Sequence, residues 1–337
     1  MSLNIAIVGA GAIGGYLGVK LALSGCQVTF IARGDNLKAL QTNGMTLINE
    51  DGTRLHAQDI QACTVEEATP HDYVFLTMKS HQVPPVAPLI SQLCHENTSV
   101  VTMQNGVPWW YFYELNGPYR NQQLASIDPN STQWRHIGPN RVIGAVVYPA
   151  AELVSPGVVQ LIEGNRFTLG EPSGEKTDRV LALSRAMIAA GFKTPVSTDI
   201  RSELWVKLWG NLTFNPVSAL THATLEEICS FGPTRELAAR MMAEAQSIGE
   251  RLGVQFKISI DKRISGAQAV GAHKTSMLQD VEQGKALELE ALLGSVIELG
   301  RICEIPTPTL DTVYAMTRLL EHSVARKGKG LSLDSGP

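Results

Sequence analysis

Residues 3–14 read Leu-Asn-Ile-Ala-Ile-Val-Gly-Ala-Gly-Ala-Ile-Gly, and this stretch decides the fold. Leu3–Val8 is a mostly apolar run, as expected for a parallel strand that is covered on both faces. A GxGxxG pattern follows at positions 9–14, and Gly15–Ser24 then has the spacing of a helix. The apolar run Gln27–Ala32 completes a βαβ unit of about thirty residues, which is the context that this glycine pattern needs.

Each glycine of the pattern has its own physical role. Gly9 permits a tight turn, Gly11 allows the backbone to approach a pyrophosphate, and Gly14 lets the helix pack closely on the strand. The N-terminus of the helix then faces the phosphates with unpaired N–H groups. The alternative is a strand–helix turn in which the glycines are incidental. We expect a dinucleotide to be bound by the residues of this turn, which are Gly9, Ala10, Gly11, Ala12, Ile13 and Gly14.

The end of the second strand predicts which dinucleotide is bound. NAD-dependent enzymes place an acidic residue there, which bonds the ribose 2′-hydroxyl and would repel a 2′-phosphate. This sequence has Ala32-Arg33-Gly34 instead, and an arginine can form charge-assisted hydrogen bonds to the phosphate. NADP(H) is therefore favoured as the cofactor. Asp35 lies two residues beyond, and Arg33 could also be a solvated surface residue, so both alternatives stay open.

The rest of the first half of the chain alternates strands with helices. Asp35 is a candidate N-cap for a helix over Asn36–Thr42, and Phe192–Val196 has the pattern of a last strand. Such alternation predicts an α/β fold with a parallel, doubly wound sheet of the Rossmann type. The other predicted strands are Met45–Ile48 and Arg54–Ile60, joined as a hairpin, Tyr73–Met78, Ser99–Met103, Arg141–Ala150, Gly157–Ile162 and Arg166–Gly170, and the other predicted helices are Pro85–Cys94 and Lys176–Ala190.

The pattern changes after Asp199, where long helical segments follow with little strand signal. We therefore place a domain boundary near residue 198. The predicted domains are a Rossmann domain at 1–198 and an all-helical domain at 199–325, followed by a flexible tail at 326–337 that is rich in lysine, glycine and serine. The predicted helices of the second domain are Ser202–Asn215, Thr234–Leu252, Ser276–Gly284, Leu287–Cys303 and Thr309–Ser323.

Composition and charge narrow the class of protein. A chain of 337 residues, with 44% hydrophobic and 18% charged residues, fits about two globular domains. The net charge of −4 comes without a basic run before the tail, which argues against nucleic-acid binding. Five widely spaced cysteines without a CxxC pair favour reduced thiols over disulfides or a zinc site. With that cysteine pattern we expect no bound metal. Because neither a signal peptide nor an apolar stretch of about 18 residues is visible, we expect a soluble cytoplasmic protein that binds no membrane.

The segment Glu203–Asn215 is the most informative part of the second domain. Lys207, Asn211 and Asn215 are spaced at i, i+4 and i+8, so they share one face of a helix. Tryptophan and leucine fill much of the remaining surface, so the helix is expected to be mostly buried. Unpaired polar groups there would cost roughly 1–3 kcal/mol each, and the stripe is therefore expected to face a partner, a ligand or a wet cleft.

This stripe suits the reduction of a carbonyl group. Hydride addition places negative charge on the carbonyl oxygen, which a lysine ammonium can stabilise and protonate. The two asparagines can donate to a substrate or hold the lysine in place. A purely structural Lys207 is the alternative. Glu203, one turn earlier, could help to keep the lysine protonated, but we favour a surface salt bridge for it.

With these residues in view, the sequence resembles the ketopantoate reductase (2-dehydropantoate 2-reductase) family over roughly residues 3–322. In the first domain the resemblance rests on GAGAIG at 9–14, Arg33, MKSHQV at 78–83 and QNG at 104–106. In the second domain it rests on KLWGNLTFN at 207–215, HKTSMLQD at 273–280 and Glu288. The glycine pattern is shared with many dehydrogenases, whereas the ordered combination in the second domain is much more specific.

The resemblance implies an NADPH-dependent oxidoreductase acting on CH–OH groups, which reduces 2-dehydropantoate to (R)-pantoate in pantothenate biosynthesis. It also implies a helical domain similar to the C-terminal domain of 6-phosphogluconate dehydrogenase. Lys207 matches the catalytic general acid of the family, and Glu288 matches the acidic residue that helps to order the site. Substrate contacts are implied for Asn105, Asn211, Asn215 and Ser276, and cofactor contacts for Arg33, Lys79, Gln82 and, at the nicotinamide, Asn105.

Physical reasoning agrees with several of these positions. Asn105 and Lys79 each follow a predicted strand, so they lie at the carboxyl edge of the sheet, where ligands bind in open α/β folds. Ser276 and Glu288 would point about 120° apart on one ideal helix. Gly284 is a suitable C′ residue, and a break there could bring both side chains to one pocket. As alternatives, Ser276 could be an N-cap and Glu288 a solvated helix residue.

The sequence also departs from the family pattern. The run around Glu288 lacks the threonine that often precedes this glutamate. Residues 108–140, with three tryptophans and many polar residues, are longer than the compact form and suggest a lid or an interaction surface. Two other functions stay open: an NADP-dependent reductase of another branched 2-oxo acid, and a non-catalytic NADP sensor, which would not need the Lys-Asn-Asn stripe. The expected partner is a small 2-oxo acid, with the chain as a monomer or a homodimer.

Overall fold

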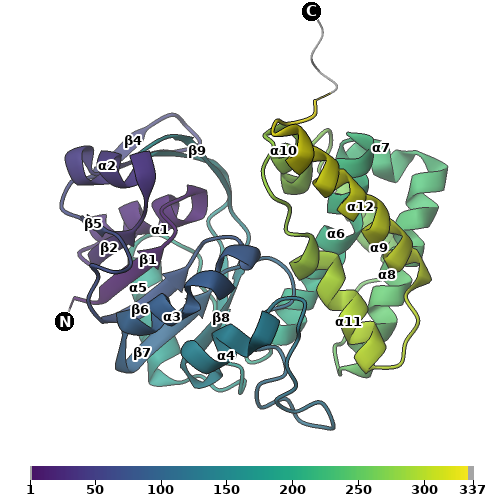
Figure 1. The fold of residues 1–337 in the computed structure, drawn as a ribbon, viewed down its shortest axis with the longest axis horizontal. Coiled ribbons are helices and arrows are strands. Elements are labelled where there is room, and N and C mark those ends of the chain that lie inside the picture. Colours follow the sequence, from purple (N-terminus) through teal and green to yellow (C-terminus); the bar gives the residue numbers. More distant parts are fainter. Residues whose placement is uncertain (1, 333–337) are drawn as a thin grey trace, which may run out of the picture. The chain divides into compact units, whose positions relative to one another are not determined.

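A computed structural model describes residues 2–332 of the chain (Figure 1). The chain divides into two compact units. The first comprises the residues up to Gln104 and Pro108–Glu203, and the second comprises Asn105–Val107 and the chain from Leu204 onward. Asn105–Val107 therefore belongs with the second unit, although the chain on either side of it belongs to the first.

Seven strands form the larger sheet of the first unit, in the order β11-β8-β7-β6-β1-β2-β5. Neighbouring strands are parallel except β8 and β11. From β1 the chain first adds β2 and β5 toward one edge of the sheet, and it then adds β6, β7, β8 and β11 toward the other edge. This order confirms the predicted doubly wound Rossmann fold. The strands are β1 (Asn4–Val8), β2 (Gln27–Ile31), β5 (Gln61–Cys63), β6 (His71–Leu76), β7 (Cys94–Thr102), β8 (Val142–Val147) and β11 (Phe167–Gly170).

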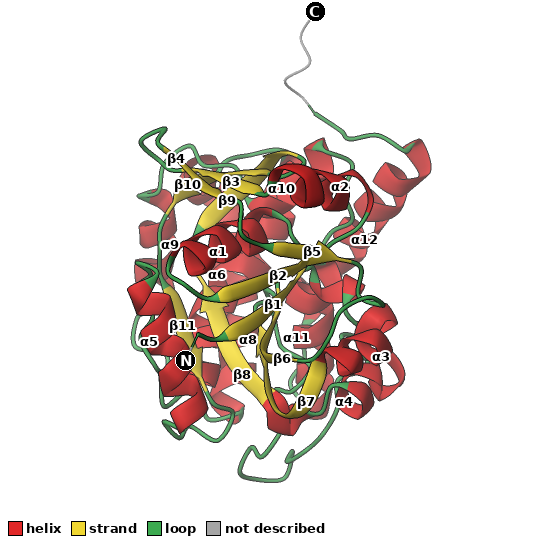
Figure 2. Ribbon diagram, turned by 90° about the vertical axis from the view of Figure 1, so that its left-hand side faces the viewer, coloured by secondary structure: helices red, strands yellow, loops and turns green. Residues whose placement is uncertain are grey.

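A smaller sheet of four strands, in the order β4-β3-β10-β9, packs on α1 (Ala12–Leu23), which therefore lies between two sheets (Figure 2). A Cβ on Gly18 would collide with Phe30 of the larger sheet, and one on Gly15 with Met45 and Val159 of the smaller sheet. The predicted hairpin is confirmed as the antiparallel pair β3 and β4, whereas a separate second sheet was not expected. The strands are β3 (Met45–Ile48), β4 (Arg54–Ala57), β9 (Ala150–Ser155) and β10 (Val158–Glu163).

The helices of the first unit are short apart from α1 and α5. The prediction of Asp35 as an N-cap is wrong: Arg33 occupies that position, and Asp35 lies inside the first turn because the helix already starts at Gly34. The remaining elements are α2 (Gly34–Asn43), α3 (Ala87–Ile90), α4 (Thr132–His136) and α5 (Asp178–Ala189), with 3₁₀ turns η1 (Ser80–Gln82), η2 (Pro84–Val86), η3 (Ser91–Leu93), η4 (Pro129–Ser131) and η5 (Pro139–Arg141).

Prolines explain two further differences from the prediction. The helix expected over Pro85–Cys94 is reduced to α3 between two 3₁₀ turns, because Pro88, inside that range, has no N–H to bond the carbonyl four residues earlier. The strand expected over Phe192–Val196 forms only two isolated bridges: Lys193 pairs with Arg166, just before β11, and Val196 pairs with Leu169 of β11. Pro195 lies within that segment and cannot donate to a strand ladder.

Segment 108–140 is packed into the first unit. Trp110 is fully buried and donates from its Nε1 to Thr102 Oγ1 at 2.8 Å. The guanidinium of Arg201 donates to the backbone carbonyls of Tyr111 and Tyr113, at 2.7 and 2.6 Å. The buried aromatic residues of segment 108–140 are therefore part of the core of the first unit. This differs from the lid or interaction surface expected from the sequence.

The second unit is helical, as predicted. Two of its helices, α7 and α9, were not expected, because each is short and neither has a long periodic pattern. The segment predicted as one helix over Leu287–Cys303 begins as a π-helical turn, η6. The elements are α6 (Ile200–Thr221), α7 (Leu225–Ser230), α8 (Gly232–Arg251), α9 (Ile260–Gln268), α10 (Ser276–Glu282), η6 (Glu290–Gly294), α11 (Ser295–Ile302) and α12 (Pro308–Lys327).

The first turn of α6 still belongs to the first unit. Glu203 accepts a hydrogen bond from the Tyr148 hydroxyl at 3.4 Å, and its carboxylate lies 3.9 Å from the Arg166 guanidinium. These contacts agree with the surface salt bridge favoured for Glu203. Glu203 is the last residue of the first unit.

The C-terminal end of α12 extends into the region predicted as a flexible tail. The helix continues to Lys327, and Gly328 ends it with a φ of +63°. Leu331 then donates its N–H to the Val281 carbonyl at 3.0 Å, whereas residues 333–337 of the predicted tail lie outside the described residues. Within residues 2–332, no helix has the length and apolar character needed to cross a membrane.

The packing of α1 between two sheets predicts the effect of a single methyl group. Gly15→Ala should lower the free energy of unfolding by about 1–3 kcal/mol, because the new Cβ overlaps Met45 and the stiff Val159 side chain. Gly266→Ala is the matched control, since Gly266 lies inside α9 with open space at its Cβ. The control should stabilise the protein by about 0.5–1 kcal/mol. Urea unfolding of both variants tests this, and equal stabilisation by both would refute the packing of α1.

Candidate active site

The glycine turn between β1 and α1 has the geometry that the sequence predicts. Gly9 has a φ of +105°, and its N–H donates to the Ile31 carbonyl at 3.1 Å. A Cβ on Gly14 would collide with the Gly9 carbonyl and with Thr77, so only glycine allows the helix to begin this close to the strand. A Cβ on Gly11 would meet open space. Gly14 is thus required by packing, whereas the surface at Gly11 is free for a ligand.

Two side chains that the sequence analysis missed hold this turn. Thr77 Oγ1 donates to the Gly9 carbonyl at 2.7 Å. Asn36 donates to the Ala10 carbonyl at 2.7 Å and accepts from the Gly157 N–H at 2.8 Å. The available signals were a polar residue at the end of an apolar strand and an asparagine at the start of a helix. Both positions commonly serve the backbone.

The turn fits a dinucleotide pyrophosphate. Gly11 is the N-cap of α1, and no side chain caps the helix there. The first N–H groups of a helix have no partners within the helix, and they carry the positive end of its dipole. Ala12 and Ile13 are the first helical residues, so their N–H groups are suited to an anion.

The three other residues expected to contact the cofactor lie in two loops of the first unit. Arg33 is exposed, and no side chain within residues 2–332 holds its guanidinium. Asp35 is also exposed, and its carboxylate lies 3.3 Å from Lys38 Nζ. Lys79 begins η1 after β6, where its N–H donates to Gln82 Oε1 at 3.2 Å. The arginine is therefore available to an anionic ligand, while the nearby acidic residue has a cationic neighbour.

In the second unit, the structure brings three of the predicted residues together. Lys207 lies on α6 and donates from Nζ to Asn105 Oδ1 at 2.7 Å. Asn105 in turn donates from Nδ2 to Glu288 Oε2 at 3.1 Å. The amide of Asn105 therefore links the ammonium to the carboxylate, and Glu288 is not the freely solvated residue considered as an alternative.

The surroundings of Lys207 shift the pKa of its ammonium group. Burial of the ammonium lowers its pKa from the usual 10.5 to about 8, and the negative charge of Glu288 opposes this shift. Burial disfavours the charged form, whereas an opposite charge favours it. Lys207 is therefore a cation near neutral pH that can give up its proton far more readily than a surface lysine.

The two other polar residues of the stripe lack partners. Asn211 is half-buried and Asn215 is only 7% exposed. Among the described residues, neither side-chain amide has a hydrogen-bonding partner. Neither amide belongs to the buried polar atoms that lack both a partner and access to solvent, so both remain accessible and are suited to binding a polar ligand.

Ser276 is exposed and is the first residue of α10. Its interpretation as an N-cap is wrong, because Thr275 caps the helix by accepting from the Leu278 N–H. The predicted chain break also occurs: α10 ends at Glu282, and Gly284 follows with a φ of +68°. Ser276 thus begins α10, whereas Glu288 lies in the loop before η6 rather than on the helix predicted for it.

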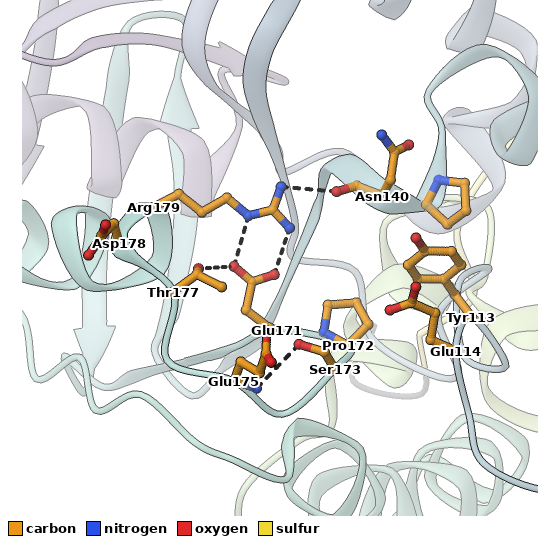
Figure 3. Close-up of a pocket in the computed structure, with 11 residues that line it drawn as sticks. Tyr113, Glu114, Asn140, Glu171, Pro172, Ser173, Glu175, Thr177, Asp178 and Arg179 are labelled. Atoms are coloured by element: carbon orange, nitrogen blue, oxygen red, sulfur yellow. Dashed lines mark hydrogen bonds and ion pairs between the residues drawn. The ribbon is translucent and has the colours of Figure 1, made fainter.

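A different cavity of the first unit, of about 400 Å³, contains none of the predicted site residues (Figure 3). Glu171, with a side chain only 3% exposed, accepts two hydrogen bonds from the Arg179 guanidinium at 2.8 and 2.6 Å. Arg179 also donates to the Asn140 carbonyl at 3.0 Å. These charges satisfy one another, and the arrangement ties the start of α5 to the chain before β8.

The chain is similar to known proteins in family, in sequence and in structure. The family model Ketopantoate reductase PanE/ApbA matches residues 5–174, and Ketopantoate reductase PanE/ApbA C terminal matches residues 199–321. The 2-dehydropantoate 2-reductase of Mesorhizobium japonicum is 53% identical over 319 residues, which cover 94% of this chain and 98% of the relative.

Solved structures of similar fold include a member of the same family. A candidate ketopantoate reductase of Ralstonia solanacearum MolK2 has a TM-score of 0.91 and 38% identity, covering 96% of this chain and 99% of the other. A D-mandelate dehydrogenase solved with NADH and anilino(oxo)acetate has a TM-score of 0.80 at 19% identity, covering 95% and 99%. At that identity, the likeness shows the fold alone.

The Rossmann unit with its glycine turn, and the helical unit with its lysine-centred cluster, define a nicotinamide-dependent oxidoreductase. The chain belongs to the ketopantoate reductase family, and the resemblance seen in the sequence is confirmed.

Proposed function

We propose that this protein reduces 2-dehydropantoate to (R)-pantoate with NADPH, and that Lys207 is the proton donor. The observation that carries the proposal is the Lys207 ammonium, held by Asn105 and charge-balanced by Glu288. A sensor that only bound the cofactor would have no use for such a group. The reaction of the Mesorhizobium relative, as its name states it, supports the choice of substrate.

The first unit supplies residues suited to the cofactor. Ala12 and Ile13 would hold the pyrophosphate with their N–H groups, and Arg33 would pair with the 2′-phosphate. Lys79 and Gln82 are further polar groups that we assign to the cofactor. When bound, the dinucleotide supplies the hydride that is added to the substrate carbonyl carbon. The preference for NADPH over NADH rests on Arg33 and is part of this proposal.

Lys207 handles the proton in this reaction. As negative charge develops on the carbonyl oxygen, the ammonium donates a hydrogen bond to it and then transfers one proton from Nζ. The product is a hydroxyl group, and the neutral amine regains its proton from water. Asn105 accepts one N–H of the ammonium and thereby limits the directions of the other two. Glu288 opposes the loss of charge that burial favours.

Asn211 and Asn215 are assigned to the substrate, together with Ser276. Their amides have no partner among the described residues, and a 2-oxo acid with a further hydroxyl group offers both donors and acceptors. Another branched 2-oxo acid would use the same residues, so the assay must compare substrates.

We place the reaction in the cytoplasm, as a step of pantothenate biosynthesis. What supports this is that all five cysteines are free thiols, two of them buried. Reduced thiols are typical of that compartment.

The direct test follows NADPH absorbance with ketopantoate, 2-oxoisovalerate, pyruvate and phenylglyoxylate. Ketopantoate is expected to give the highest kcat/KM. A clear preference for another of these acids would replace the substrate but keep the reaction type. No turnover with any of them would contradict the proposed function.

Lys207→Ala should lower kcat by about 100-fold or more while NADPH still binds, since general acid catalysis contributes that much. In the native protein, kcat should also fall as the pH rises above about 8, because the ammonium is then lost. Lys257→Ala, at an exposed lysine of the same unit, is the control. Steady-state kinetics and fluorescence titration with NADPH measure the two effects. Near-normal turnover of the Lys207 variant would exclude it as the acid.

Arg33→Asp should weaken NADPH binding by about tenfold or more and leave NADH binding much less affected, because a charge-assisted bond to the phosphate is lost. Arg54→Asp, at an exposed arginine of β4, changes the net charge equally and is the control. Dissociation constants of both dinucleotides provide the measurement. An unchanged NADPH/NADH ratio in the Arg33 variant would mean that another residue reads the phosphate.

A further inference from the structure

The π-helical turn η6 connects the predicted catalytic residues through its backbone. Such a turn interrupts the regular hydrogen-bond ladder of a helix and is often found at functional sites. In η6, the Ala291 carbonyl accepts the Val107 N–H at 3.0 Å and the Ser295 hydroxyl at 2.7 Å. Gly106 has a φ of +93°, and a Cβ there would collide with the Ala291 carbonyl. The turn therefore fixes the peptide that carries Asn105.

A side chain from α12 holds this turn. Tyr314 donates from its hydroxyl to Glu290 Oε1 at 2.7 Å, and Arg318 lies 3.5 Å from the same oxygen. A Cβ on Gly294 would collide with the Glu290 carboxylate, so the glycine makes room for it along the turn. Burial and the bond to Glu290 raise the pKa of Tyr314 to about 12, so the hydroxyl remains a donor at working pH.

The same helix also holds the residue before Glu288. Glu321 accepts the Leu287 N–H at 3.2 Å, and Arg318 bridges from Glu290 to Glu321. Glu288 thus lies between two points, Leu287 and Glu290, that are both bonded to α12. None of these α12 side chains contacts Lys207 directly through a hydrogen bond in the described chain.

We propose that Tyr314 and Glu290 are positioning residues for the reaction, which clamp η6 so that Glu288 and Asn105 keep their places around Lys207. The proposal rests on the proposed function of Lys207. Its physical consequence concerns charge: if the clamp loosens, Glu288 moves relative to the ammonium and stabilises it less. Lys207 then loses its proton at a lower pH.

Tyr314→Phe removes only the hydroxyl that holds Glu290. It should lower kcat with ketopantoate by about 2–10-fold, the effect of one lost hydrogen bond, with the KM for NADPH unchanged. It should also move the alkaline limb of the kcat–pH profile down by about half a pH unit or more. A loss of folded protein alone would reduce the amplitude of the profile without moving the limb.

Two controls separate the clamp from a general loss of stability. Tyr73→Phe removes a tyrosine hydrogen bond of similar length, to the Arg179 carbonyl at 2.8 Å in the first unit, and should leave the limb in place. Glu290→Gln still offers an oxygen to Tyr314 and should preserve the limb, whereas Glu290→Ala should move it as Tyr314→Phe does. A limb that moves in Glu290→Gln as far as in Glu290→Ala would overturn the hydrogen-bond clamp.

A second readout does not depend on turnover. Amide hydrogen exchange at Val107 should speed up in Tyr314→Phe and not in Tyr73→Phe, because the Val107 N–H is bonded to the Ala291 carbonyl of η6. Unchanged exchange together with an unmoved limb would overturn the clamp. If the native protein reduces none of the four 2-oxo acids, the proposed function fails, while faster exchange at Val107 would still support the mechanical part of the inference.

Discussion

The hydrogen bond between Lys207 and Asn105 is the contact on which the proposed chemistry of the second unit depends. An ammonium taken out of water is costly unless it is paired, and in practice such a group either finds partners or loses its charge. Here it has both an amide acceptor and, through that amide, the carboxylate of Glu288. The result is a lysine with a pKa of about 8, which is charged at neutral pH and yet ready to release its proton.

Maintaining this contact requires segments that are distant in the sequence. Asn105 belongs to the three-residue segment that joins the second unit, Lys207 lies on α6, and Glu288 precedes η6. The Ala291 carbonyl binds this segment, and Tyr314 on α12 binds the turn that contains Ala291. In the π-helical turn the Ser295 N–H bonds the Glu290 carbonyl, and the Ala291 carbonyl accepts the Val107 N–H as well as the Ser295 hydroxyl.

Much of this protein could be predicted from its sequence, because the signals were local. The glycine turn depends on three positions within one loop, and the stripe of Lys207, Asn211 and Asn215 follows from helical spacing alone. What escaped prediction depends on pairing across long distances in the chain. The second sheet requires β3 to pair with β10, and Asn36 serves the turn by bonding Gly157. No periodicity in the sequence reports such contacts.

The choice between NAD and NADP also depends on contacts that the sequence does not report. Sequence alone left Asp35 as a reason to consider NAD, since an acidic residue near the second strand can bind the ribose. In the structure, Asp35 lies in the first turn of α2 with Lys38 beside it, while Arg33 is exposed and unengaged within residues 2–332. The local arrangement therefore leaves Arg33 available to an anionic ligand, as the proposed use of NADPH requires, and a linear motif could not supply this observation.

In the proposed reaction, Lys207 is a proton donor whose pKa is set by burial and by Glu288. The most direct test is an NMR titration of the native protein labelled with ¹³C at the lysine ε-carbon, with Lys207→Met used to assign the signal. The account predicts a midpoint near 8, and a lower midpoint in Glu288→Gln, where the negative charge is absent. A midpoint near 10.5 in the native protein, unchanged in Glu288→Gln, would contradict it.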